Sequence, residues 1–163
     1  MGLADIFKKL FGTKAERDMK AIKPLLDKVL AAYEDIDKLS NDELRAKTEE
    51  LKAFVASRIA DDEKRIAEIK AQLDGDLAIE EKEKLATESD KLVKKVDEDI
   101  ETALNEILPQ AFAIMKSTAR RFAQNAEVEV TANDFDRKLA ASHDFVEIRP
   151  GKDGEPDKAA GVT

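Results

Sequence analysis

The feature that most restricts the fold of this chain is a long stretch of helical apolar spacing, with one glycine and no proline between residues 41 and 108. From Leu44 to Leu73, apolar residues are separated by steps of 7, 4, 4, 7, 3 and 4. Residues 74–76, Asp-Gly-Asp, give the first turn signal. From Leu85 to Ile107 the apolar steps are 7, 4, 4, 4 and 3. This near-heptad pattern predicts a long antiparallel helical hairpin at about 41–108.

The two legs of this predicted hairpin are residues 41–73 and 79–108, roughly 50 and 45 Å long. The expected seam residues are Leu44, Leu51, Val55, Ile59, Ile66, Ile69 and Leu73 on the first leg and Leu85, Leu92, Val96, Ile100, Leu104 and Ile107 on the second. Dense charge elsewhere on both legs predicts solvated outer faces, including the acidic runs 61–63 and 97–99.

The hairpin has recognisable boundary signals. Ser40 is a good N-cap, and Glu43 three residues later completes a capping box. Pro109 is expected to end the second leg, because proline disfavours helix at the preceding residue, and to begin a new helix at about 109–124. We expect one face of that helix to pack in the core; its residues are Phe112, Met115, Ala119 and Phe122.

Shorter elements are predicted on either side of the hairpin. Residues 15–37 carry helical apolar spacing with Pro24 inside, so either the helix kinks there or a new helix begins. Residues 127–131 alternate as a short strand. A helical turn capped by Asn133 follows it.

A second strand is expected at 144–149, pairing with the first as a short β-hairpin near 127–149. After Pro150 the sequence becomes a polar, turn-rich C-terminal tail without a cap or an apolar anchor, so the chain looks cut rather than finished. The predicted fold class is mainly α, with several helices around the long hairpin.

The composition excludes several classes of protein. The chain has 163 residues, no cysteine and a net charge of −8, so disulfide-stapled and cysteine-ligated zinc proteins are excluded. No apolar stretch is long enough to span a membrane, and the first residues lack the apolar run and cleavage site of a secretory signal, so we expect a soluble intracellular protein. Residues 1–30 carry a net charge of +3 and the remainder −11. The acidic remainder disfavours binding to nucleic acid, whereas the basic segment at residues 1–30 suits binding to an anionic surface.

The amino terminus carries an amphipathic pattern. One helical face holds Leu3, Ile6, Phe7, Leu10 and Phe11. Lys8 and Lys9 lie off that face, and Gly12 is a plausible stop. Either this helix lies in a membrane interface with its lysines toward anionic lipid, or its apolar face packs on the protein's own bundle or on a partner helix.

The sequence shows no self-contained active site. His143 is the only histidine, which leaves no histidine-rich metal site. Asp144 and Glu147 near it are expected to be surface groups. Gly151-Lys152 is not a phosphate-binding loop, because Val146 stands where the pattern needs a glycine.

Three blocks resemble, in order, the amino-terminal region of the SecA family of preprotein translocase motor ATPases. They are MGLADIFKKLFGTKAERDMKAIKPLL at 1–26, LSNDELRAKTEELKA at 39–53 and LPQAFAIMKSTARRF at 108–122. Asn41 and Asp42 replace the usual Asp-Glu of the second block, and Gln110 replaces a glutamate in the third. The long segment between these two blocks resembles the insertion of the Bacteroidetes-type variant.

The resemblance implies a division of the chain. Residues 1–14 would be an amphipathic membrane- and channel-binding helix, residues 15–53 a helical lead-in to the first nucleotide-binding domain, and residues 54–107 a hairpin insertion. Residues 108–163 would hold a helix and the start of the motor's strand region, ending before the adenine-contacting motif and the phosphate loop. The positions matching the family's lipid- and channel-binding helix are Leu3, Ile6, Phe7, Lys8, Lys9, Leu10, Phe11 and Lys14. Those matching a structural helix of the motor are Leu108, Pro109, Phe112 and Arg120.

The resemblance also implies an activity for the whole protein. It would couple ATP hydrolysis, with magnesium, to the passage of preproteins through the SecYEG channel, as a cytoplasmic protein peripheral on the inner face of the cell membrane. This piece would supply attachment to anionic lipid and channel, not catalysis, and would bind no cofactor itself. The alternatives are a stand-alone helical adaptor with an amphipathic head, or an antiparallel coiled-coil homodimer. A phosphate loop encoded shortly after residue 163 would favour the translocase.

Overall fold

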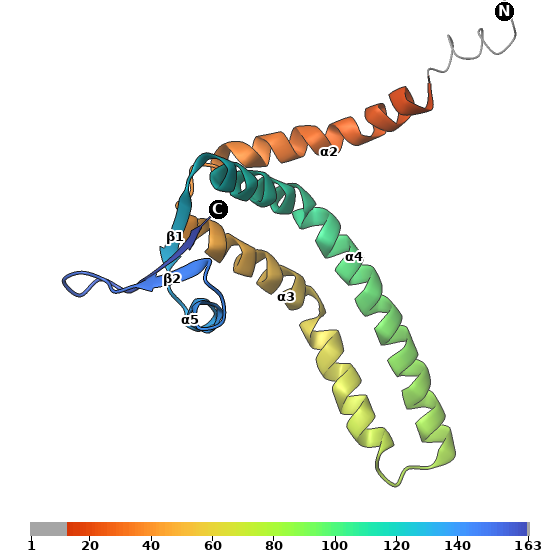
Figure 1. The fold of residues 1–163 in the computed structure, drawn as a ribbon. Coiled ribbons are helices and arrows are strands. Elements are labelled where there is room, and N and C mark those ends of the chain that lie inside the picture. The colour runs from red at the N-terminus through yellow and green to blue at the C-terminus, as the bar shows by residue number, and fades with distance from the viewer. Residues whose placement is uncertain (1–12, 163) are drawn as a thin grey trace, which may run out of the picture.

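The computed structural model describes residues 13–162, and it is mainly helical with one small sheet (Figure 1). Its elements are α2 (Lys14–Ile36), α3 (Asn41–Leu73), α4 (Ile79–Gln124), β1 (Glu127–Thr131), α5 (Asp134–Ala140), β2 (Val146–Arg149) and β3 (Lys158–Val162). The three long helices meet at one end, from which α2 projects one way and the α3–α4 hairpin another. The predicted mainly α fold class is confirmed. None of the helices described here is long and apolar enough to cross a membrane.

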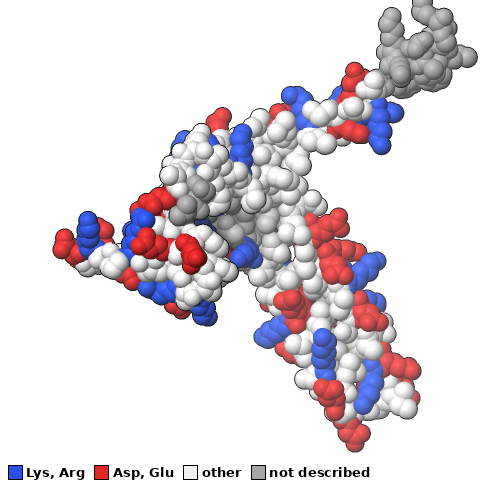
Figure 2. Space-filling view, viewed as in Figure 1, with Lys and Arg blue, Asp and Glu red and all other residues white. Residues whose placement is uncertain are grey.

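The predicted helical hairpin is present. The helix α3 begins after Ser40, whose hydroxyl accepts from the Glu43 amide while the Glu43 side chain accepts from the Ser40 amide, as a capping box requires. Ile69 is fully buried in the seam. Ion pairs join the two legs, between Arg58 and Glu106 and between Lys95 and Asp62, among others. Figure 2 shows charge of both signs along this arm.

The prediction that Leu104 lies in the seam is wrong. Leu104 is 49% exposed, whereas its neighbour Ala103 is 2% exposed. Ala103 lies seven residues after Val96, so the heptad spacing continues through it. The expected seam holds only larger aliphatic residues, and so it includes Leu104 in place of the alanine. An alanine in the seam lets the two legs approach closely.

The predicted helix boundary at Pro109 is wrong, because α4 runs through it without interruption. Pro24 likewise lies inside α2, which is one helix. A proline inside a helix removes one backbone hydrogen bond and costs about 3 kcal/mol. On either side of Pro109, Ile107 and Ala111 pack against the buried cluster that α4 forms with α2 and α3, and this packing outweighs the local cost.

The predicted core face of the C-terminal part of α4 is also wrong. Phe112, Met115 and Phe122 are exposed by 53%, 66% and 53%. The buried residues of α4 lie on the opposite side and are Ala103, Ala113, Ile114, Ser117 and Arg121. Since α2 and α3 both pack on that side, the larger apolar side chains are left outside.

The core of the molecule lies where the three long helices meet. Its buried residues are Ile36, Leu44, Leu51, Ala113 and Ile114, one or two from each helix. Tyr33 packs against this cluster, and the Lys116 ammonium lies 4.3 Å from the centre of its ring. Figure 2 shows a largely uncharged surface where α2 meets α4.

The small sheet is antiparallel, with strand order β1-β3-β2. Glu127 of β1 pairs with Val162, and Val146 of β2 pairs with Gly161. Both predicted strands therefore exist, but the predicted pairing between them is wrong. The segment expected to be a polar tail supplies the central strand, β3, instead. Its small residues give little strand signal, yet Ala159 and Ala160 are buried.

Candidate functional site: a polar clamp and an apolar groove

The residues proposed to bind membrane or channel lie almost wholly outside the described part of the chain. These are Leu3, Ile6, Phe7, Lys8, Lys9, Leu10 and Phe11. Lys14 is described: it is the first residue of α2 and is exposed. Thr13 caps this helix, because its side chain accepts from the Glu16 amide while Glu16 accepts from the Thr13 amide. A well-capped helix therefore begins directly after the amphipathic segment.

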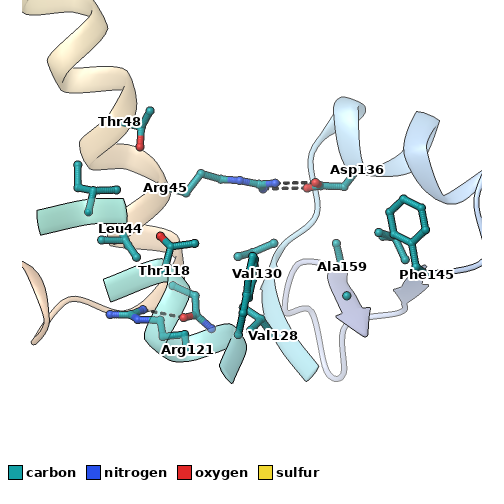
Figure 3. Close-up of a pocket in the computed structure, with 15 residues that line it drawn as sticks. Leu44, Arg45, Thr48, Thr118, Arg121, Val128, Val130, Asp136, Phe145 and Ala159 are labelled. Atoms are coloured by element: carbon teal, nitrogen blue, oxygen red, sulfur yellow. Dashed lines mark hydrogen bonds and ion pairs between the residues drawn. The ribbon is translucent and has the colours of Figure 1, made fainter. Parts of the chain in front are cut away.

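A groove of about 620 Å³ lies between the sheet and the helices α3 and α4 (Figure 3). Most of its wall is apolar, and the residues concerned include Leu44, Ile114, Val128, Val130, Val146 and Ala159. Phe122 and Phe145 also line it and are both about half exposed. The polar groups at this groove are largely engaged with one another.

The strongest polar contact at the groove joins Arg45 on α3 to Asp136 on α5. The two terminal guanidinium nitrogens donate to the two carboxylate oxygens at 2.8 and 2.5 Å. Figure 3 shows the two groups pointing at each other across the space between their elements. Asp136 is only 4% exposed and also accepts from the Asn133 amide. The hydrogen bond from Arg45 is the main reason why the pKa of Asp136 lies below its ordinary value.

A second contact ties the first turn of α3 to β1. The amide and the hydroxyl of Thr131 donate to the two carboxylate oxygens of Asp42 at 2.6 and 2.7 Å. Burial alone would raise the pKa of Asp42, but these hydrogen bonds, with the charges of Lys158 and Arg45, outweigh burial and lower it. Asn41 donates from its side chain to the Glu129 carbonyl at 2.9 Å.

Two arginines at the C-terminal end of α4 hold the turn between α2 and α3. The Arg121 side chain is 9% exposed and donates to the side chain of Asn41 at 2.6 Å and to the Leu39 carbonyl. Arg120 donates to Asp37 at 2.8 Å, and the Ser117 hydroxyl donates to the same oxygen at 2.9 Å. Together these contacts, with those of Arg45 and Asp42, form the polar clamp. It fixes the sheet and the three helices in one arrangement.

Sequence reasoning missed the polar clamp. Its residues are Asp37, Asn41, Asp42, Arg45, Ser117, Arg120, Arg121, Thr131 and Asp136. Several lie in the quoted blocks at 39–53 and 108–122, and the concentration of polar residues around a helix start was the available signal. The predicted surface groups His143, Asp144 and Glu147 are all exposed. His143 stacks on Phe145 with ring centres 5.0 Å apart.

The clamp does not fit the nucleotide and magnesium implied for a SecA motor. The two arginines that line the groove, Arg45 and Arg121, are occupied by Asp136, Asn41 and a backbone carbonyl, so neither is available for a phosphate. Within residues 13–162 no group of three or more histidine, cysteine, aspartate or glutamate side chains could hold a metal. The arrangement can hold elements together and expose apolar surface.

The fold and the clamp thus define a helical structural module with an attached sheet. Residues 7–134 match the family model of the SecA DEAD-like domain, and the chain belongs to this family. It is 52% identical over 153 residues to the protein translocase subunit SecA of Phocaeicola vulgatus, and 48% and 45% identical over 152 residues to those of Parabacteroides distasonis and Bacteroides fragilis. These matches cover 93% of this chain but only 13–14% of each relative. No solved structure matches the chain.

Proposed function

We propose that this chain is the amino-terminal portion of a SecA subunit of the protein translocase. The whole subunit would couple ATP hydrolysis to the transfer of preproteins across the membrane through SecYEG, with ATP and magnesium bound elsewhere in the protein. The observation that carries the proposal is the family match over residues 7–134, supported by relatives whose name is protein translocase subunit. Such a subunit would be cytoplasmic and peripheral on the inner face of the cell membrane.

Within that subunit, we propose that this portion supplies attachment to anionic lipid and to the channel. The support is the sequence of the first fourteen residues, in which five apolar residues share a helical face beside Lys8 and Lys9. The exposed Lys14 adds a further positive charge at the start of α2. A short segment of this kind anchors weakly, so attachment should be reversible and sensitive to salt.

Vesicle binding tests this attachment. The 163-residue chain should sediment with vesicles containing an anionic phospholipid and much less with neutral vesicles, and the difference should shrink in high salt. Phe7→Glu or Phe11→Glu should abolish binding. Phe135→Glu is the matched control, because Phe135 is a phenylalanine on α5 that is 66% exposed. Equal binding to neutral vesicles, or full binding by the Phe7 and Phe11 variants, would contradict the proposal.

A further inference from the structure

The chain contains two Asp-Gly pairs, at residues 74–75 and 153–154. Such a pair is open to a reaction within the chain, because glycine has no side chain to hinder attack of its backbone nitrogen on the preceding aspartate side chain. The two pairs are alike in sequence, since each is followed by another acidic residue, Asp76 or Glu155. The fold places them in different surroundings.

The first pair is held at the end of α3. Asp74 is the C-cap of this helix, with helical φ and ψ angles of −72° and −13°. Its amide donates to the Lys70 carbonyl at 3.2 Å, and the Gly75 amide donates to the Gln72 carbonyl at 3.0 Å. A Cβ atom on Gly75 would lie 3.1 Å from that same carbonyl oxygen, so the turn is closely packed. Rotation of the Asp74 backbone would break these hydrogen bonds.

The second pair forms a tight turn between β2 and β3, in a loop that projects from the sheet (Figure 1). The Glu155 amide donates to the Lys152 carbonyl at 2.9 Å. Asp153 and Gly154 lie between them with φ angles of 50° and 92°, and two positive values are typical of a type I′ turn. Among the described residues, Asp153 is the only one other than glycine with a positive φ, which is an unfavourable conformation for a residue with a side chain.

The reacting groups of the second pair are free. Within residues 13–162, neither the Asp153 side chain nor the Gly154 amide takes part in a hydrogen bond or an ion pair. Asp153 is exposed, and a Cβ atom on Gly154 would meet no other atom within 4 Å. The Asp153 backbone can therefore rotate until its side-chain carbon Cγ meets the Gly154 nitrogen.

We propose that Asp153 is a site of spontaneous conversion to isoaspartate, and that the fold protects Asp74 from the same reaction. The Gly154 nitrogen forms a bond to Cγ of the protonated Asp153 carboxyl group, and the amide hydrogen and the carboxyl hydroxyl leave as water. The product is a five-membered succinimide ring. Water then adds to the main-chain carbonyl carbon of Asp153 and breaks its bond to the Gly154 nitrogen, which leaves a free α-carboxylate. The reaction needs no reactant other than water.

The position of the modified residue gives the reaction a structural consequence. Isoaspartate routes the main chain through the former side chain and so adds a methylene group to the loop between β2 and β3. The far end of this loop is anchored, because Asp157 accepts from the Gly151 amide at 3.2 Å and pairs with Arg137 of α5 at 2.9 Å. The central strand β3 begins at the next residue, Lys158. The modification therefore alters the turn that leads into β3, and its new carboxylate makes the chain a substrate for an isoaspartyl methyltransferase.

Uptake of heavy oxygen tests the proposal. The folded chain is kept in water enriched in oxygen-18 at neutral pH, and mass spectrometry of its proteolytic peptides follows the label that each ring hydrolysis introduces. The peptide containing Asp153 should gain label about fivefold faster or more than the peptide containing Asp74, because Asp74 must first lose the hydrogen bonds at the end of α3. An isoaspartyl methyltransferase with labelled S-adenosylmethionine should modify the Asp153 peptide.

Two matched variants and an unfolded sample serve as controls. Asp153→Glu should remove the rapid uptake, because glutamate would have to form a larger ring, whereas Asp74→Glu should leave uptake at Asp153 unchanged. In guanidinium chloride, where the chain is unfolded, the two Asp-Gly pairs should react at similar rates. Equal rates in the folded chain, a difference that persists after unfolding, or no methylation at Asp153 would overturn the proposal. None of these measurements depends on membrane attachment or on translocation.

Discussion

The Arg45 guanidinium and the Asp136 carboxylate form a two-pronged ion pair across 91 residues of sequence. The pair joins the second turn of α3 to the short helix α5, which lies between the strands β1 and β2. The Asp136 carboxylate also accepts from the backbone amide of Asn133, the N-cap of α5, and so completes the capping box of that helix. One carboxylate therefore fixes both the start of α5 and the distant contact with α3.

Arg45→Ala should therefore loosen the sheet from the helices. The variant leaves the buried Asp136 without its charged partner, and we expect a loss of about 2 kcal/mol in the free energy of unfolding. Urea unfolding measures the loss, and amide hydrogen exchange should show it in β1. The control is Lys47→Ala, which removes an exposed ion pair with Glu50 and should cost about 0.5 kcal/mol or less. Equal effects of the two variants would show that the Arg45–Asp136 pair is unimportant.

The polar clamp should also give acid sensitivity. The pKa values of Asp42 and Asp136 are lowered in the folded protein, so both groups stabilise it above the ordinary aspartate value of 3.8. That stabilisation is lost as the pH falls through the lowered values. Melting temperatures measured from neutral pH into acid should fall less steeply for Asp136→Asn than for the unaltered chain. If the melting temperatures of the two proteins fall in parallel as the pH is lowered, the stabilising role given to the ionised Asp136 is contradicted.

Two adjacent residues of α4 provide a matched test of the hairpin seam. Leu92 is half-buried against α3, whereas Val93 points outward and is 47% exposed. Leu92→Asp places a charge in the seam and should lower the melting temperature by several degrees. Val93→Asp adds the same charge one position along and should leave it nearly unchanged. Thermal unfolding followed by circular dichroism compares the two variants. A larger loss of melting temperature for Val93→Asp than for Leu92→Asp would mean that the register of the seam is wrong.

The central strand should be the weak point of the sheet. Ala160 of β3 is paired with Glu129 of β1 and with Glu147 of β2. Ala160→Pro removes a backbone donor from the middle strand, so both outer strands should lose protection from hydrogen exchange. Protection in the α3–α4 hairpin should remain. If β1 stays protected in this variant, the strand order described above is incorrect.

Much of the helical framework could be predicted from the sequence. Ser40 and Glu43 mark the start of α3, Leu73 marks its end, and Asn133 caps α5, as the structure confirms. These signals work because capping and helical periodicity act between residues three or four positions apart. The membrane- and channel-binding residues at 1–14 remain a prediction, because only Lys14 is described.

Other features escaped sequence reasoning for physical reasons. A helix running through Pro109 depends on packing by two neighbouring helices, which no local rule contains. The partners in the polar clamp are some 80 to 91 residues apart, as with Ser117 and Asp37 or Arg45 and Asp136. The strand β3 gives almost no signal of its own, since small residues fit a central strand only when its neighbours are present.

The sequence by itself determined the long hairpin, the helix caps, the basic amino terminus and the resemblance to the SecA family, because each depends on spacing or residue type along a short stretch. Only the tertiary structure decided which face of α4 is buried and how the three strands pair. Those outcomes depend on which apolar surfaces meet in space, and α2 and α3 bury the side of Ala113 while leaving Met115 exposed. Helical spacing along the chain places both residues in α4 but does not say which of the two faces its neighbours will cover.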